Sequence, residues 1–214
     1  MTVEQLPAPR RSHARSNRAR LLATARAELT GNPDASLEEI ARAAGVARRT
    51  LYGHFPNRQA LIAALAEEAT QHIEQSFTAA RRPGDDAVTA MARMTLAVWA
   101  VGDRYRMLLS LARHDLGEEG IRAAIAPARA EASSVLERGQ REGAVIVHLP
   151  VPVLAQMLEA VTLSLLEAQN TNDWSDPSGE AAAVSVLLAA GVPEADALKC
   201  VRDLIAENGH HGVC

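Results

Sequence analysis

The sequence predicts an all-α protein in which a small three-helix head is joined by a long helix to a larger helical body. Of the 214 residues, 42 are alanine and only six are aromatic, a usage poor in the residues that strands favour. Apolar residues recur at helical spacing along most of the chain. The short apolar run at residues 145–147 lies between a glycine and a proline, and we interpret it as a connector.

The first three predicted helices are short and lie close together in the sequence. Residues 17–29 form an amphipathic helix. The second helix begins with a capping box, because Ser36 is followed three residues later by Glu39. A tight turn at Gly45 leads to a third helix over residues 48–55. This spacing is typical of a helix-turn-helix.

Charge is distributed unevenly along the chain. Residues 1–60 contain ten arginines and five acidic residues, a net charge of +5, whereas residues 61–214 carry a net charge of −9. This asymmetry favours a head that binds a polyanion such as DNA, although arginine-rich helices can also simply solvate a surface. The basic arm, residues 1–16, could reach the DNA backbone or minor groove, or be a solvated tail. The arginines considered for this role are Arg10, Arg11, Arg15 and Arg18.

The helix-turn-helix segment resembles the N-terminal domain of the TetR family of bacterial transcription regulators. The matching stretch is residues 36–61, in which Ala44-Gly45-Val46 is followed by Thr50-Leu51-Tyr52, by His54-Phe55 and by Leu61. Two departures are Ala47, where a capping serine or threonine is common, and Arg58, where lysine is common. The resemblance implies a cytoplasmic, homodimeric regulator of the repressor type, which binds a palindromic operator and is released by a small-molecule effector.

The head offers several side chains for binding DNA. Arg48 and Arg49 can reach guanine edges from the start of the third helix, while Tyr52, His54 and Arg58 suit phosphates. Tyr52 and His54 could instead pack the head together. The predicted DNA-binding residues are Ser36, Arg48, Arg49, Thr50, Tyr52, His54 and Arg58.

The remaining helices form the body, which we take as residues 61–214 after the head at residues 17–60. A long helix begins at Asn57 and ends near Pro83. Further helical patterns cover residues 85–101, 103–113, 118–142 with a kink at Pro127, 152–169, 179–190 and 194–208.

The resemblance implies an effector cavity among the first helices of the body. Large side chains of this region are usually core, but some of them should line such a cavity. The body has four aromatic residues, which favours an aliphatic or small polar effector over a flat cationic one. The candidate effector-binding residues are Phe77, Met91, Met94, Trp99, Tyr105 and Leu108.

Two helices near the end of the chain have more apolar positions than one exposed helix needs. Residues 152–169 carry a leucine-rich stripe, and residues 179–190 are apolar nearly all round. With the same pair from a second copy they would form a four-helix bundle, although both could be core helices of a monomer. The predicted interface residues are Leu154, Leu158, Val161, Leu165, Val184 and Leu187.

Other classes of function lack a motif. The sequence has no hydrolase, zinc-protease, dinucleotide or phosphate-loop signature, so the alternative of an all-α enzyme or small-molecule carrier with a vestigial head has little support.

His114 and Glu118 could share a metal ion but lack a third ligand. Cys200 and Cys214 suit neither a disulfide framework nor zinc. The longest nearly apolar stretch, residues 181–192, is too short to cross a bilayer, so we expect no membrane partner and no cofactor.

Overall fold

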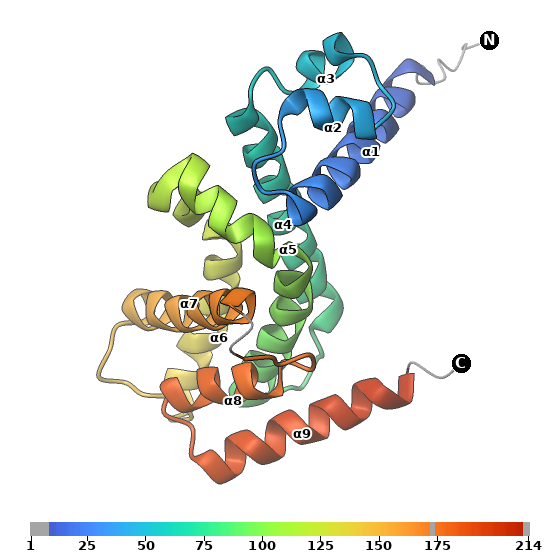
Figure 1. Cartoon of the computed structure of the whole chain (residues 1–214). Helices are drawn as coiled ribbons and strands as arrows, with labels where there is room; N and C mark the ends of the chain where they lie inside the picture. Colours follow the sequence, from blue (N-terminus) through green and yellow to red (C-terminus); the bar gives the residue numbers. More distant parts are fainter. Residues whose placement is uncertain (1–8, 172–173, 212–214) are drawn as a thin grey trace, which may run out of the picture.

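The computed structural model describes residues 9–171 and 174–211, and the predicted all-α fold is confirmed for them, since no strand occurs in these ranges (Figure 1). Residues 1–8 of the predicted arm and the side chains of Arg10, Arg11 and Arg15 lie outside the described residues. The helices are α1 (Pro9–Gly31), α2 (Leu37–Ala43), α3 (Arg48–His54), α4 (Arg58–Ala80), α5 (Ala87–Ala124), α6 (Ala126–Arg141), α7 (Val151–Ala168), the short 3₁₀ helix η1 (Gln169–Thr171), α8 (Glu180–Ala189) and α9 (Glu194–His211).

Helices α1 to α3 and the start of α4 form the head. The capping box is present at α2, because the Ser36 hydroxyl accepts a hydrogen bond from the Glu39 amide at 3.2 Å and the Glu39 carboxylate accepts one from the Ser36 amide at 2.7 Å. The turn after α2 is closed by the Val46 amide, which donates to the carbonyl oxygen of Ala41 at 3.0 Å. Buried Leu51 then fixes α3 against the other two helices.

Helices α4 and α5 connect the head to the body and pack along each other (Figure 1). Helix α4 begins at Asn57, whose side chain accepts a hydrogen bond from the Ala60 amide at 2.7 Å. The buried cluster of the head continues through Leu61 and Leu65 of α4 to Tyr105 and Leu108 of α5. Head and body therefore share one hydrophobic core.

Two predicted helix boundaries in the body are wrong. The chain does not break between residues 101 and 103, because α5 runs through Gly102, where a side chain from α7 fills the space beside the glycine. The bend comes at Gly117, in the gap between the predicted helices over residues 103–113 and 118–142, and its φ of +69° is in the left-handed region that glycine tolerates. The predicted helix over residues 118–142 divides at Ile125, so Pro127 lies in the first turn of α6, where its missing amide hydrogen costs nothing.

Helix α5 is at the centre of the body and contacts α4, α6, α7, α8 and α9. A second buried cluster joins α5 to α6, α7, α8 and α9 around Met91, Leu136, Leu154, Leu187 and Val201. Helix α9 crosses the end of the body that lies farthest from the head (Figure 1).

Helix α7 is unusually apolar and only partly covered. By length and composition alone it could cross a membrane, since its mean hydropathy is 1.4. Of its 18 residues, 22% are buried inside the chain. One side packs against α6 and α8. Its other side exposes Val153, Ala160 and Ser164, and Leu188 of the neighbouring helix α8 is also exposed. The apolar surface of α7 and α8 therefore continues from the core to the outside.

The start of α8 is fixed by a buried contact with α5. Trp99 is 2% exposed, and its indole N–H donates to the carbonyl oxygen of Asp176 at 2.7 Å. The Asp176 carboxylate in turn accepts a hydrogen bond from the Ala182 amide in the first turn of α8 at 2.9 Å. Gly179, at φ +75°, lies directly against the Trp99 ring, so that a Cβ atom there would lie 2.7 Å from Trp99 Cδ1.

We expect Gly179→Ala to destabilise the protein more than Gly143→Ala. Both glycines have a left-handed φ, +75° and +69°, and an alanine costs about 1–2 kcal/mol in this region. Only Gly179 also faces a buried ring, which adds an overpacking cost of about 1–3 kcal/mol, whereas a Cβ at Gly143 meets nothing within 4 Å. Denaturant unfolding at one fixed protein concentration measures the free energy of unfolding of the two variants. Equal losses in the two variants would show that the Trp99 contact is not rigid.

Candidate functional site

The first turn of α3 presents three polar side chains to solvent. Arg48, Arg49 and Thr50 are exposed, while Leu51 anchors the helix from below. Two adjacent arginines at the beginning of a recognition helix are in the position from which such helices read base edges in the major groove.

Arg48 is held by an acidic residue of α2. Its guanidinium lies 2.6 Å from Glu38 Oε1 and stacks over the Tyr52 ring at 5.0 Å from the ring centre. The Tyr52 hydroxyl donates to the same Glu38 oxygen at 2.9 Å, and this bond, together with Arg48, lowers the pKa of Glu38 below its usual value. Arg48 is thus paired in the free protein, and Glu38 is a functional neighbour that the sequence analysis missed.

Arg49 is the unengaged arginine of α3. Within the part of the chain that the structure describes, it has no hydrogen-bond or ion-pair partner, and its side chain is exposed. A free guanidinium can form two parallel hydrogen bonds to guanine without first breaking an internal contact. Of the two arginines, Arg49 is the better placed to read a base.

The other predicted DNA-binding residues have structural contacts. Ser36 is exposed, but its hydroxyl belongs to the capping box. His54 is half-buried, with its ring 6.1 Å from that of Phe55. Arg58 donates to the carbonyl oxygens of Pro33 at 2.5 Å and Ala35 at 2.8 Å. Arg18, expected to contact DNA with the arm, stacks on Phe55 and lies 3.8 Å from Glu67.

Polar side chains join the head to the body at two points. Arg58 Nε lies 3.4 Å from the Asp115 carboxylate, just before the bend in α5, and Gln59 donates to the Asp115 carbonyl oxygen at 3.2 Å. Farther along α4, the Tyr105 hydroxyl meets Arg26 at 2.8 Å and His72 at 2.6 Å. Burial raises the pKa of Tyr105, which keeps this hydroxyl neutral.

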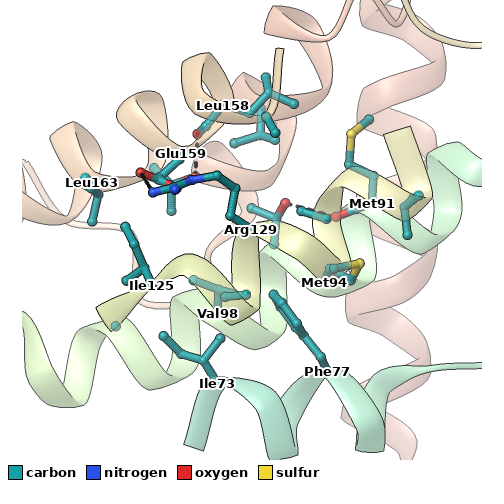
Figure 2. A pocket seen from close by; sticks show the side chains of 18 of the residues that line it. Ile73, Phe77, Met91, Met94, Val98, Ile125, Arg129, Leu158, Glu159 and Leu163 are labelled. Carbon is teal, nitrogen blue, oxygen red and sulfur yellow. Dashed lines mark hydrogen bonds and ion pairs between the residues drawn. The ribbon is translucent and has the colours of Figure 1, made fainter. Parts of the chain in front are cut away.

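Helices α4 to α8 enclose an apolar cavity of about 170 Å³ (Figure 2). Ile73, Phe77, Met94 and Val98 form one side of it. On the other side, α6 and α7 bring Arg129 against Glu159, together with Ile125, Leu158 and Leu163.

A second cavity of about 110 Å³ lies between the first cavity and the head. The described residues that line it include no charged side chain, and its polar groups are Thr70 and Tyr105. Its walls include Ile62 and Leu65 of α4 and Leu108 of α5, which belong to the core shared with the head.

The predicted effector-binding residues divide between these places. Phe77, Met91 and Met94 line the first cavity, and Tyr105 and Leu108 line the second. Trp99 lines neither cavity, because its indole is packed between Gly179 and Trp174. The sequence pattern places all six on consecutive helices but does not show which way each side chain faces.

The charged pair in the first cavity was missed by the sequence analysis. Arg129 donates to both carboxylate oxygens of Glu159, from Nε at 2.6 Å and from Nη2 at 2.9 Å, and this bonding raises the pKa of Arg129. The available signal was Glu159 itself, because a carboxylate directly after Leu158 interrupts the apolar pattern of α7.

The predicted interface residues also divide. Leu154, Leu158 and Leu187 are buried inside one chain, and Leu158 also lines the first cavity. Val161, Leu165 and Val184 are half-buried near the outer side. The exposed residues of the same two helices are Pro152, Val153, Gln156, Ala160, Ser164, Glu167, Ala181 and Leu188.

His114 and Glu118 do not come together as ligands. His114 faces Asp115 at 3.5 Å, while Glu118 pairs with Arg113 at 3.2 Å. Among the residues that the structure describes, no group of three His, Cys, Asp or Glu side chains could hold a metal ion.

Comparisons with known proteins find a family model that matches the head and solved structures that share the fold. Residues 21–65 match the sequence model described as bacterial regulatory proteins, tetR family. No curated protein matches the chain. Solved structures with the same fold include LfrR from Mycobacterium smegmatis in complex with proflavine, with 21% identity, a TM-score of 0.63 and coverage of 83% of this chain and 96% of that one.

Two further structures have the same fold. FadR from Bacillus subtilis in complex with stearoyl-CoA is 20% identical, with a TM-score of 0.68 and coverage of 80% of this chain and 97% of that one. PfmR from Thermus thermophilus is 19% identical, with a TM-score of 0.63 and coverage of 81% of this chain and 98% of that one. The head thus matches the N-terminal domain of tetR-family regulatory proteins over residues 21–65, and the whole described chain has the fold of these solved regulators.

We expect Arg49→Ala to remove sequence discrimination, whereas Arg42→Ala lowers affinity alone. Each substitution deletes one exposed positive charge from the head, so both weaken the attraction of phosphates. Loss of a base contact should cost Arg49→Ala a further 1–3 kcal/mol, roughly, on the cognate site only. Titrations of both variants against cognate and scrambled duplexes measure the ratio of cognate to scrambled affinity. If this ratio changed equally in the two variants, Arg49 would be a phosphate contact.

Proposed function

We propose that this protein is a ligand-responsive regulator of the repressor type, which binds a palindromic operator as a homodimer and is released by a small apolar effector. The observation that carries the proposal is the position of the second cavity. It lies within the same buried core that holds the recognition helix in place, between Leu65 of α4 and Leu108 of α5. A molecule that entered this space would act directly on the packing of the head.

The junction offers a route from the cavities to the head. Helix α4 lines both cavities through Ile73, and its first residue, Arg58, holds the loop between α1 and α2 through two carbonyl oxygens. Arg58 also faces Asp115 of α5. A shift of α4 against α5 would therefore rotate the head, and an effector that binds better to the shifted form would favour it.

The exposed apolar residues of α7 and α8 support dimerisation. Val153 is 48% exposed and Leu188 is 41% exposed, and small residues such as Ala160, Ser164 and Ala181 lie on the same outer side. Small side chains let helices of two copies approach closely, and a second copy would remove this apolar surface from water. Two heads related by a two-fold axis would then match a palindromic operator.

The alternative of an enzyme or carrier with a vestigial head is not favoured. In the described lining of the first cavity, the charged groups are Arg129 and Glu159, and they neutralise each other. The exposed, unpaired Arg49 on α3 is a feature that a vestigial head would have no reason to keep.

The proposal is tested by selecting fragments from the genome of the source organism with the purified protein. A selected fragment should be retarded at nanomolar protein concentration, and its affinity should fall steeply with salt because the arginines of two heads displace counterions from phosphates. A log–log slope of affinity against salt that is near zero, or no preference for any fragment, would overturn the assignment.

We expect Ala160→Glu to dissociate the dimer. The substitution places a charge where α7 of one copy would meet α7 or α8 of the other, and burying an unpaired carboxylate costs several kcal/mol, roughly. Ala79→Glu is the matched control, because it introduces the same change at an exposed position of α4. Sedimentation velocity should show a folded monomer for the first and a dimer for the second. A dimeric Ala160→Glu protein would place the interface elsewhere.

A further inference from the structure

The two cavities adjoin each other. Five residues, contributed by α4, α5, α7 and the C-terminal cap of α5, line both of them. They are Ile73, Gly102, Ile125, Leu163 and Leu166. The second cavity therefore lies beside the first, on the side toward the head.

Gly102 and Leu166 are in contact at this boundary. A Cβ atom at position 102 would lie 2.8 Å from both methyl carbons of Leu166, closer than such atoms approach in real structures. Leu166 therefore fills the space beside Gly102, and a chain can pass from one cavity to the other here only when Leu166 moves. Leu166 is buried and packs on its other side against Trp99 and Ala182, so a molecule that crosses here must displace it slightly toward Trp99.

The hydroxyl groups along the two cavities are already engaged. Thr95 donates to the carbonyl oxygen of Met91, and Thr162 donates to that of Leu158. In the second cavity, the Thr70 hydroxyl lies within hydrogen-bond distance of the carbonyl oxygens of Ala66 and Ala124. The hydrogen-bonding groups of these threonines are therefore not directed at a ligand.

The Arg129–Glu159 pair is where a ligand can bond. Arg129 Nε and Nη2 both donate to Glu159, while Nη1 has no partner among the described residues. A hydroxyl group can accept a hydrogen bond from Nη1 and donate one to a free lone pair of the carboxylate. A charged head group would instead bring a third charge to a neutral, partly buried pair, which is unfavourable.

We propose that the effector is an uncharged straight-chain amphiphile, with a hydroxyl or similar neutral group at Arg129 and Glu159 and an alkyl tail that passes Gly102 into the second cavity. This inference rests on the proposed function and specifies the ligand class of the same site. Only the tail reaches the core shared with the head, so chain length determines whether binding is transmitted. Short members fill the first cavity and leave the head in place.

The test uses the full-length protein and primary alcohols from hexanol to dodecanol, with calorimetry in the absence of DNA. Each methylene that enters an apolar cavity should increase affinity about fourfold, and this increase should continue past the length that fills the first cavity. Dodecanoate and dodecylammonium are compared with dodecanol. Tighter binding of either ion than of the alcohol, or affinity that stops rising at short chains, would overturn the proposal.

Two variants close the second cavity in different ways. Gly102→Ala adds a methyl group at the boundary, and Ala69→Leu fills the second cavity, so each should abolish the gain from longer chains. Ala69 lines the second cavity alone, so Ala69→Leu should leave hexanol affinity within about twofold of its original value. Ala100→Val, at an exposed position of the same helix as Gly102, is the matched control. Because the two variants act at separate positions, one that fails to fold leaves the other informative. Unchanged dodecanol affinity in either folded variant would contradict the proposal.

A second measurement separates this inference from the proposed function. Retardation of the selected operator fragment is repeated with each alcohol, and long but not short members should release the DNA. Operator binding without any alcohol binding would overturn the ligand class and leave the regulator intact. Alcohol binding by a protein that selects no operator would overturn the regulator and leave the cavity assignment.

Discussion

The structure depends on a buried core that continues from the head into the first helices of the body. In many two-domain proteins a linker separates two cores, and each domain can move without disturbing the other. Here Leu61 and Leu65 are buried in the head cluster and belong to the same helix that lines the cavities. Displacement at one end of α4 must therefore be accommodated at the other, since packed interiors do not deform continuously.

The local features of the head could be predicted from sequence because their causes are local. The capping box at Ser36 and the turn at Gly45 depend on residues within a few positions of one another, and the match over residues 21–65 agrees with that interpretation. The continuity of α5 could not be predicted this way. The helix continues through Gly102 because of what lies beside that glycine, and Leu166 is far from Gly102 in sequence.

The direction of side chains was the least predictable feature of the candidate site. Helices α7 and α8 are apolar on almost every side, so their sequence cannot separate Leu154 and Leu187, which face the core, from Val153 and Leu188, which face outward. Trp99 is a similar case, because its indole is directed away from the cavities by a hydrogen bond to a residue 77 positions later in the chain. Such long-range contacts leave no periodic pattern.

The contact between Arg48 and Glu38 has a consequence for how the protein searches a genome. A carboxylate 2.6 Å from the guanidinium occupies the place that a DNA phosphate would otherwise take. If the proposed function holds, a duplex that contacts Arg48 through the same nitrogen competes with Glu38 for it, so unrelated DNA should gain less from this arginine than its charge suggests. The expected consequence is a shorter time on sites that offer phosphate contacts without base contacts.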